Sequence, residues 1–317
     1  MGSRNLAITV RSGAAAVAAI AVAACSSRTG SRVAGPPAIM SGGTGSGPVA
    51  ALADPSAVAM VTASADPHPV TKVTASADPR PVTKVTASAH PYTVATVGAL
   101  FPGGVASPHS CTAGVVDSPS GNVIVTAAHC VAGGGTGIVF VPGYDDGGAP
   151  YGSWTVTKAY AAAGWISGQD PKMDYVFLVV SPLSTNATSA PLQSVTGGNV
   201  LGTAPRPGYT VTVAAYRAGR DDQPVICASR VYLSGGYPSF DCAGYVAGTS
   251  GAPWIVGYES STGAGTITAV IGGLNQGGCS SGTSYGAPFT AATKQLLARA
   301  VAGGPADILP ASLPATC

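Results

Sequence analysis

One serine in the second half of the chain stands between glycines, in Gly248-Thr249-Ser250-Gly251. A serine hydroxyl becomes a nucleophile when a base takes its proton. Flanking glycines let the chain turn sharply, so that backbone amides can converge where a developing oxyanion would lie. The residue types therefore predict acyl-transfer chemistry, with Ser250 as nucleophile and the Gly248 and Ser250 amides as oxyanion donors. In a chain with 44 glycines such a string arises easily by chance, so it needs support from elsewhere.

That support comes from a histidine, because a serine needs a base within hydrogen-bond reach. His129 lies in Thr126-Ala127-Ala128-His129-Cys130, directly after the apolar run Val123-Ile124-Val125. The other three histidines are weaker candidates, since two fall in a repetitive segment and one in a polar loop: His68, His90 and His109. We expect His129 to be the general base.

In this order, the two strings resemble the chymotrypsin/trypsin-like serine peptidases, whose triad runs His, Asp, Ser along the chain. The resemblance covers roughly residues 97 to 299. At three further places the sequence is similar to the secreted bacterial branch of this family: Val97 to Phe101, Phe140 to Tyr144 and Tyr151 to Trp154. It implies two six-stranded antiparallel β-barrels with a C-terminal helix and a catalytic cleft between the barrels. It also implies peptide-bond hydrolysis through an acyl-enzyme, with no cofactor and no metal.

The apolar pattern supplies the class of fold independently. Short apolar runs are divided by Gly, Pro, Asn, Asp and Ser turns, which indicates an all-β sandwich or barrel. The runs are Cys111–Val116, Val123–Val125, Ile138–Val141, Tyr175–Val180 and Thr210–Tyr216. Only Ala291 to Val301 has convincing helical periodicity.

The third triad member is expected to be Asp174, which precedes the apolar strand that begins at Tyr175. An aspartate at the mouth of a core strand can be held and partly buried while it faces His129, and in the family the triad aspartate opens such a strand. Asp170 is the neighbour most easily confused with it. Asp145 and Asp146 are interpreted as turn residues, because two carboxylates without further ligands make a poor calcium site.

Departures from the family pattern bear on specificity and activation. The base of the primary pocket is expected near Gly244 and Tyr245, with no carboxylate at the position that makes trypsin prefer Lys or Arg; Asp241, three residues earlier, is the one residue that could change this. The opposite wall is expected at Gly273, Leu274 and Asn275, without a histidine. We therefore expect small or apolar side chains to be preferred. Thr249 replaces the aspartate that pairs with a new N-terminus in animal members, so activation by that ion pair is not expected.

Seven cysteines leave one unpaired in an oxidising compartment. Cys111 and Cys130 bracket a strand, a turn and a second strand, so a hairpin can bring them together, and the family has a bridge in this place. Cys227 and Cys242 are the next expected pair, which leaves Cys279 for Cys317. That last pairing requires the C-terminal tail to lie back across the second barrel. The usual family partner of Cys279 would fall where this chain has Val246.

The N-terminal part predicts export. Residues 1–25 carry Arg4 and Arg11 before an apolar run too short to span a bilayer stably. The run ends in Val22-Ala23-Ala24-Cys25, which resembles the bacterial lipoprotein box and makes Cys25 the expected lipidation site; ordinary signal-peptidase cleavage nearby is the alternative. Residues 26–96 hold a twelve-residue repeat around Val-Thr-Ala-Ser-Ala-Asp-Pro, interpreted as an extended linker or else a removable propeptide. Residues 97–317 form the expected peptidase domain.

Composition limits the partners. Charged residues make up 9% of the chain, and without Arg4 and Arg11 there are 13 basic and 13 acidic residues, which gives nucleic acid no electrostatic attraction. We expect a monomer, exported to the cell surface or medium, that acts on a protein or peptide substrate and attaches to a membrane only through Cys25. A binding domain that keeps the fold without turnover, or a serine esterase, are the alternatives. Trp154, Trp165 and Trp254 are expected to pack in the core.

Overall fold

The computed structural model describes residues 86–89, 93–184, 190–220, 222–315 and 317. The predicted signal segment, Cys25, His68, His90 and the first two repeats lie outside the described residues, whereas residues 86–89 of the third repeat are described. Within the described part, no helix has the length and hydrophobicity required to cross a membrane.

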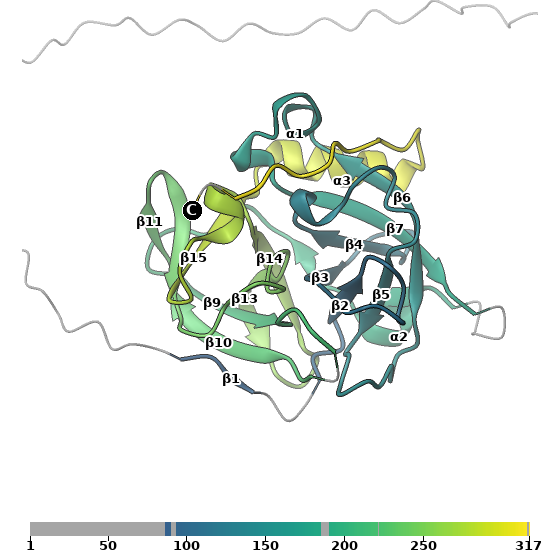
Figure 1. Cartoon of the computed structure of the whole chain (residues 1–317), viewed down its shortest axis with the longest axis horizontal. Helices are drawn as coiled ribbons and strands as arrows, with labels where there is room; N and C mark the ends of the chain where they lie inside the picture. Colours follow the sequence, from purple (N-terminus) through teal and green to yellow (C-terminus); the bar gives the residue numbers. More distant parts are fainter. Residues whose placement is uncertain (1–85, 90–92, 185–189, 221, 316) are drawn as a thin grey trace, which may run out of the picture. The chain divides into compact units, whose positions relative to one another are not determined.

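The first half of the described chain forms a closed barrel of six antiparallel strands in the order β2-β3-β4-β7-β6-β5 (Figure 1). The strands are β2 (Val97–Phe101), β3 (Cys111–Val116), β4 (Val123–Thr126), β5 (Val139–Pro142), β6 (Trp154–Ala161) and β7 (Val176–Pro182). Side chains of β4 alternate between two cores: Ile124 packs inside the barrel, whereas Val123 and Val125 pack in the core shared with the second sheet. Strands β3, β4 and β5 are buried on both faces, which explains why they are apolar runs in the sequence, whereas in β6 apolar residues alternate with polar ones.

The second half forms a nine-stranded sheet that curls around its own core. Its strands are β1 (Ser88–Ala89), β8 (Val200–Leu201), β9 (Thr210–Ala215), β10 (Val225–Arg230), β11 (Tyr232–Ser234), β12 (Tyr237–Asp241), β13 (Pro253–Glu259), β14 (Ala264–Ile271) and β15 (Thr283–Pro288). Their order is β1-β10-β9-β13-β14-β15-β12-β11, and β8 pairs in parallel with β14. The all-β prediction is confirmed. The second sheet is a curled half-barrel that recruits the two-residue strands β1 and β8.

Helices are few and short. They are α1 (Ala163–Gly168), α2 (Leu192–Thr196), α3 (Ala291–Ala302) and the 3-10 turns η1 (Ala128–Cys130), η2 (Pro171–Met173) and η3 (Leu274–Gly277). The predicted C-terminal helix corresponds to α3, which a capping box between Thr290 and Thr293 begins and Gly303 ends in the left-handed conformation. Trp154, Trp165 and Trp254 are all buried, as expected.

His109 lies in the loop between β2 and β3, as expected, but its side chain is buried. Its side chain is fully buried, and Nε2 lies 2.6 Å from Asp222 Oδ1. The rings of Phe101, Tyr144 and Tyr216 surround it edge to face. Asp222, Tyr144 and Tyr216 all lie more than 30 residues away, so the polar neighbours of His109 in the sequence did not predict its burial.

Candidate active site

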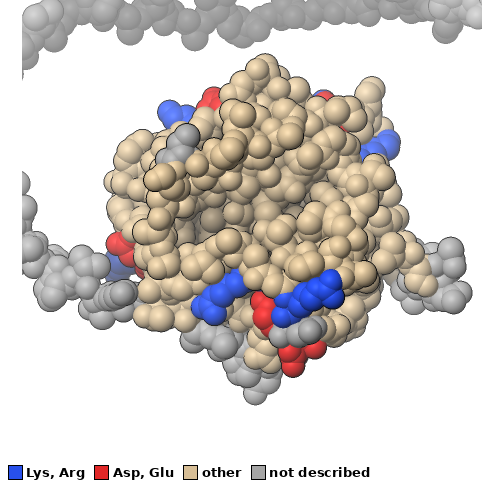
Figure 2. Space-filling model, viewed as in Figure 1, with Lys and Arg blue, Asp and Glu red and all other residues tan. Residues whose placement is uncertain are grey.

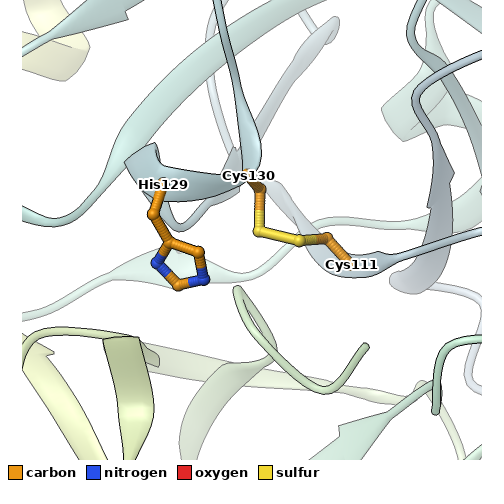
Figure 3. A group of neighbouring side chains, drawn as sticks. All are labelled: Cys111, His129 and Cys130. Carbon is orange, nitrogen blue, oxygen red and sulfur yellow. A yellow bond between two sulfur atoms is a disulfide. The ribbon is translucent and has the colours of Figure 1, made fainter. Parts of the chain in front are cut away.

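His129 lies on η1, the single turn that follows β4. The preceding strand is wholly buried, so it fixes where the turn begins. A disulfide from Cys130 to Cys111 on β3 holds the other side of the turn, with an S–S distance of 1.96 Å. Figure 3 shows this bond next to the imidazole. The position of His129 is thus set by a core strand on one side and a covalent link on the other.

Asp174 orients that imidazole. The carboxylate accepts a hydrogen bond from His129 Nδ1 at 2.7 Å and from the His129 backbone amide at 2.9 Å. A third bond comes from the Gly273 amide at 2.9 Å. An ionised carboxylate only accepts, so the proton belongs on Nδ1 and Nε2 is left to act as a base. A Cβ on Gly272 would lie 2.9 Å from Asp174 Oδ2, which explains the glycine there.

Ser250 is positioned by the glycines on either side of it. Gly248 has φ +95°, and a Cβ there would lie 1.9 Å from the Ala218 amide nitrogen. Gly251 has φ +81°, and its Cβ would lie 2.0 Å from Thr126 Oγ1. Both positions therefore exclude a side chain on steric grounds as well as by conformation.

Two threonines join the serine loop to the first barrel. The hydroxyl of Thr112, on β3, donates to the Gly248 carbonyl at 3.0 Å and accepts from the Tyr216 amide at 2.9 Å. The backbone amide of Thr112 donates to the Ser250 carbonyl at 2.8 Å. Thr126, the first residue of the histidine string, donates to the Thr112 carbonyl at 2.7 Å. Sequence reasoning missed Thr112, because its partners lie more than 100 residues away and nothing local marks it.

The amides of Gly248 and Ser250 make no backbone hydrogen bond within the described residues. Both residues line the same cleft as His129. Buried or partly buried amides normally find a partner, so two unpaired donors beside a cleft suit an incoming oxygen atom. Within the described residues no hydrogen bond joins the Ser250 hydroxyl to the His129 imidazole, and such catalytic contacts often tighten only when substrate binds.

The cleft beside Ser250 has a volume of about 610 Å³. Of the five residues expected to form the primary pocket, Tyr245 and Asn275 line it. Gly273 and Leu274 line an adjoining pocket, and Gly244 lines neither; its carbonyl instead accepts from Arg217 Nε at 3.0 Å.

No charged side chain lines this cleft within the part of the chain that the structure describes. The surrounding face also carries few Lys, Arg, Asp or Glu side chains (Figure 2). Asp241 lies outside the cleft and accepts hydrogen bonds from the hydroxyls of Tyr232 at 2.6 Å and Thr283 at 2.8 Å. Burial and the bond to Asp241 raise the pKa of Tyr232 to about 12. The Tyr245 hydroxyl points away from the cleft, donates to the Val213 carbonyl at 2.5 Å, and has a pKa raised by burial.

One group of residues has metal-ligand types at close range. Ligand atoms of Cys111, His129 and Cys130 lie within 4.8 Å of one another. Both sulfurs are consumed by the disulfide, so no thiolate remains to bind an ion. Within the described residues, no third acidic, histidine or cysteine side chain joins Asp145 and Asp146 to share a cation.

A closed six-stranded barrel, a curled second sheet and a C-terminal helix give this chain the chymotrypsin-like serine peptidase fold, and its solved structural neighbours share it. The solved protease Anisep from Arthrobacter nicotinovorans is 25% identical, with a TM-score of 0.56 over 66% of this chain and 97% of its own. The thermostable serine protease AL20 from an extremophilic microorganism is 20% identical, with a TM-score of 0.55 over 66% of this chain and 98% of its own. Human heparin binding protein is 14% identical, with a TM-score of 0.50 over 72% of this chain and all of its own. No protein-family description and no curated protein sequence matches the chain.

Proposed function

We propose that this chain is a serine endopeptidase in which Ser250 attacks the carbonyl carbon of a peptide bond. His129 Nε2 takes the hydroxyl proton and later gives it to the leaving amine, while Asp174 keeps the imidazole in the required tautomer. The amides of Gly248 and Ser250 stabilise the oxyanion of each tetrahedral intermediate. Water then hydrolyses the acyl-enzyme by the same route in reverse.

One observation carries this proposal. The Asp174 carboxylate accepts two hydrogen bonds from His129, and His129 lines the same cleft as Ser250. A domain that needed only to bind would not require a buried carboxylate aimed at one imidazole nitrogen. The uncharged cleft, with the Tyr245 hydroxyl turned away, favours substrates with a small or apolar side chain before the scissile bond.

The test is labelling of the full oxidised chain with a fluorophosphonate, which reacts with an activated serine, followed by mapping of the adduct by mass spectrometry. Labelling at Ser250 that disappears in His129→Ala supports the proposal. Ser120→Ala is the matched control, because Ser120 is exposed in the turn between β3 and β4 and its loss should leave labelling unchanged.

The second candidate is a binding domain without turnover. The similarity to human heparin binding protein supports this second candidate, because that protein has the same fold and is named for binding. A folded, disulfide-bonded chain that does not label would favour this alternative. A chain that labels and cleaves esters, but no member of a diverse peptide library, would favour a serine esterase.

We further propose that the protein is exported and anchored through a lipid on Cys25, with residues 26–96 as a linker or propeptide. Three disulfides are typical of proteins that fold in an oxidising compartment. They use six of the seven cysteines and leave only Cys25. A Cys25→Ser chain should move from the membrane fraction to the soluble fraction; if it stays as membrane-bound as the parent, the lipid anchor is refuted.

A further inference from the structure

The C-terminal segment, residues 309–315 with Cys317, runs from the first barrel to the rim of the cleft. At one end Leu309 is buried in the first-barrel core and exchanges two backbone hydrogen bonds of 2.9 Å with Gly133. At the other end Cys317 forms a disulfide with Cys279, which follows η3. In Figure 1 the yellow trace leaves α3, passes α1 and ends near β15. The segment is therefore fixed at both ends.

Two glutamines hold the middle of the segment. Gln169 uses both ends of its amide: Nε2 donates to the Ala311 carbonyl at 2.9 Å, and Oε1 accepts from the Leu313 amide at 2.9 Å. Gln276 Nε2 donates to Ser312 Oγ at 3.0 Å and to the Leu313 carbonyl. These bonds fix the backbone on either side of Leu313.

The glutamines adopt an unusual backbone conformation to do so. Gln169, Asn275 and Gln276 have φ values of +49°, +50° and +56°, and Asp146 is the fourth non-glycine residue with positive φ in the described chain. Such residues are uncommon outside glycine, and they cluster where function maintains the strain. Three of the four line the cleft or the pocket next to it.

The segment walls a second pocket. This pocket has a volume of about 230 Å³. Its apolar wall is formed by Trp165, Pro171, Leu274, Leu313 and Pro314, and its polar side includes Gln169 and Asp174. It shares three residues with the Ser250 cleft: Asn275, Gln276 and Ala315. Leu313 lines the pocket although it is 63% exposed, so its side chain stands at the open mouth and is not a plug.

We infer that the C-terminal segment determines specificity, by forming the wall of a subsite for an apolar side chain of the substrate. The side chain would belong to a neighbour of the residue held in the Ser250 cleft, because the two pockets adjoin through Asn275 and Gln276. This inference rests on the proposed peptidase function. Within the described residues the segment makes no hydrogen bond to His129, Asp174 or Ser250, so its role is to select the substrate and not to take part in bond cleavage.

The experiment measures selectivity and serine activation separately. Parent and variant full chains are profiled with an internally quenched peptide library varied at three positions on each side of the scissile bond, and are labelled with the fluorophosphonate. Leu313→Ala should lower the preference for apolar over polar side chains at one neighbouring position by about three- to tenfold, because part of an apolar pocket is removed. The double variant Cys279→Ser and Cys317→Ser, which frees the segment's end, should lower it further. The labelling rate of Leu313→Ala should stay at the parental value, because Leu313 lines the second pocket and not the Ser250 cleft.

Ile308→Ala is the matched control. Ile308 is 71% exposed on the same stretch of chain but lines neither pocket, so its loss should change no preference. A parent that labels at Ser250, with Leu313→Ala and the double cysteine variant showing parental selectivity, would overturn this inference and leave the proposed function standing. A parent chain that neither labels at Ser250 nor cleaves peptides would refute both the proposed function and this inference.

Discussion

The first barrel holds His129 through side-chain bonds, whereas the Ser250 loop depends mainly on close backbone approach at two glycines, with one side-chain bond from Thr112. Asp174 grips the imidazole and its amide together, and the disulfide of Cys130 secures the turn. The loop of Ser250 instead fits between Ala218 and Thr126 only because Gly248 and Gly251 lack side chains. The half of the site that holds the base His129 therefore depends on the Asp174 carboxylate. The half that holds the nucleophile Ser250 depends on the absence of a Cβ at Gly248 and at Gly251.

The largest expected effect comes from removing the charge on the base half. Asp174→Asn should lower kcat/KM about 10,000-fold, because an amide at this place favours the wrong imidazole tautomer while leaving the shape unchanged. Steady-state kinetics on a cleaved peptide measure this. Asp170→Asn is the control: Asp170 caps η2 through the Lys172 amide at 2.9 Å, so its change should stay within about twofold. Equal losses in the two variants would contradict the assignment of Asp174.

The next effect tests the nucleophile half by adding one methyl group. Gly248→Ala must displace the loop from Ala218, which moves an oxyanion donor and should lower kcat about 100- to 1,000-fold. Gly257→Ala is the comparison, since Gly257 also has positive φ, at +64°, but nothing lies within 4 Å of the added Cβ. It should cost about 1 to 2 kcal/mol of unfolding free energy and leave kcat unchanged. Urea unfolding and peptide kinetics separate the two results.

The smallest effect tests the link between the halves. Thr112→Val leaves the Gly248 carbonyl and the Tyr216 amide without their buried partner, which should lower the free energy of unfolding by about 1 to 3 kcal/mol. The fluorophosphonate labelling rate should fall as well, because the Gly248 peptide is no longer held. Thr112→Ser keeps the hydroxyl and should recover the labelling rate. If valine and serine label alike, the hydroxyl does not position the loop.

The sequence predicts the parts of the site whose signal is local. His129 follows a buried strand, and Asp174 precedes one, so each can be placed from neighbouring residues. Strands β3, β4, β5 and β7 of the first barrel were equally clear as short apolar runs, whereas β6 was not, because polar residues interrupt it. Strands β12 and β15 were not recognised either, since their two prolines, two serines and one glycine resemble turn sequence.

What the sequence cannot give is the pairing of distant residues. Gly251 packs closely against the Thr126 hydroxyl, which brings the serine string against the histidine string, and neither string by itself predicts this contact. The same holds for His109, whose aspartate and aromatic partners come from three separate segments. The Cys279–Cys317 bond was expected only as the remaining pair, whereas the glutamines that guide the tail to it had no sequence signal.

The short strand β1 limits how far the chain can be shortened from its N-terminal side. Ser88 and Ala89 pair with Ile226 and Val225 of β10, and Ala87 is buried against the second core. A proteolytic cut upstream of Thr86 keeps this pairing, whereas a cut just before Val97 strips it away and bares the hydrogen-bonding edge of β10. An open edge of that kind recruits other strands and promotes aggregation. Any shortened form of the chain should therefore keep the last residues of the repetitive tract.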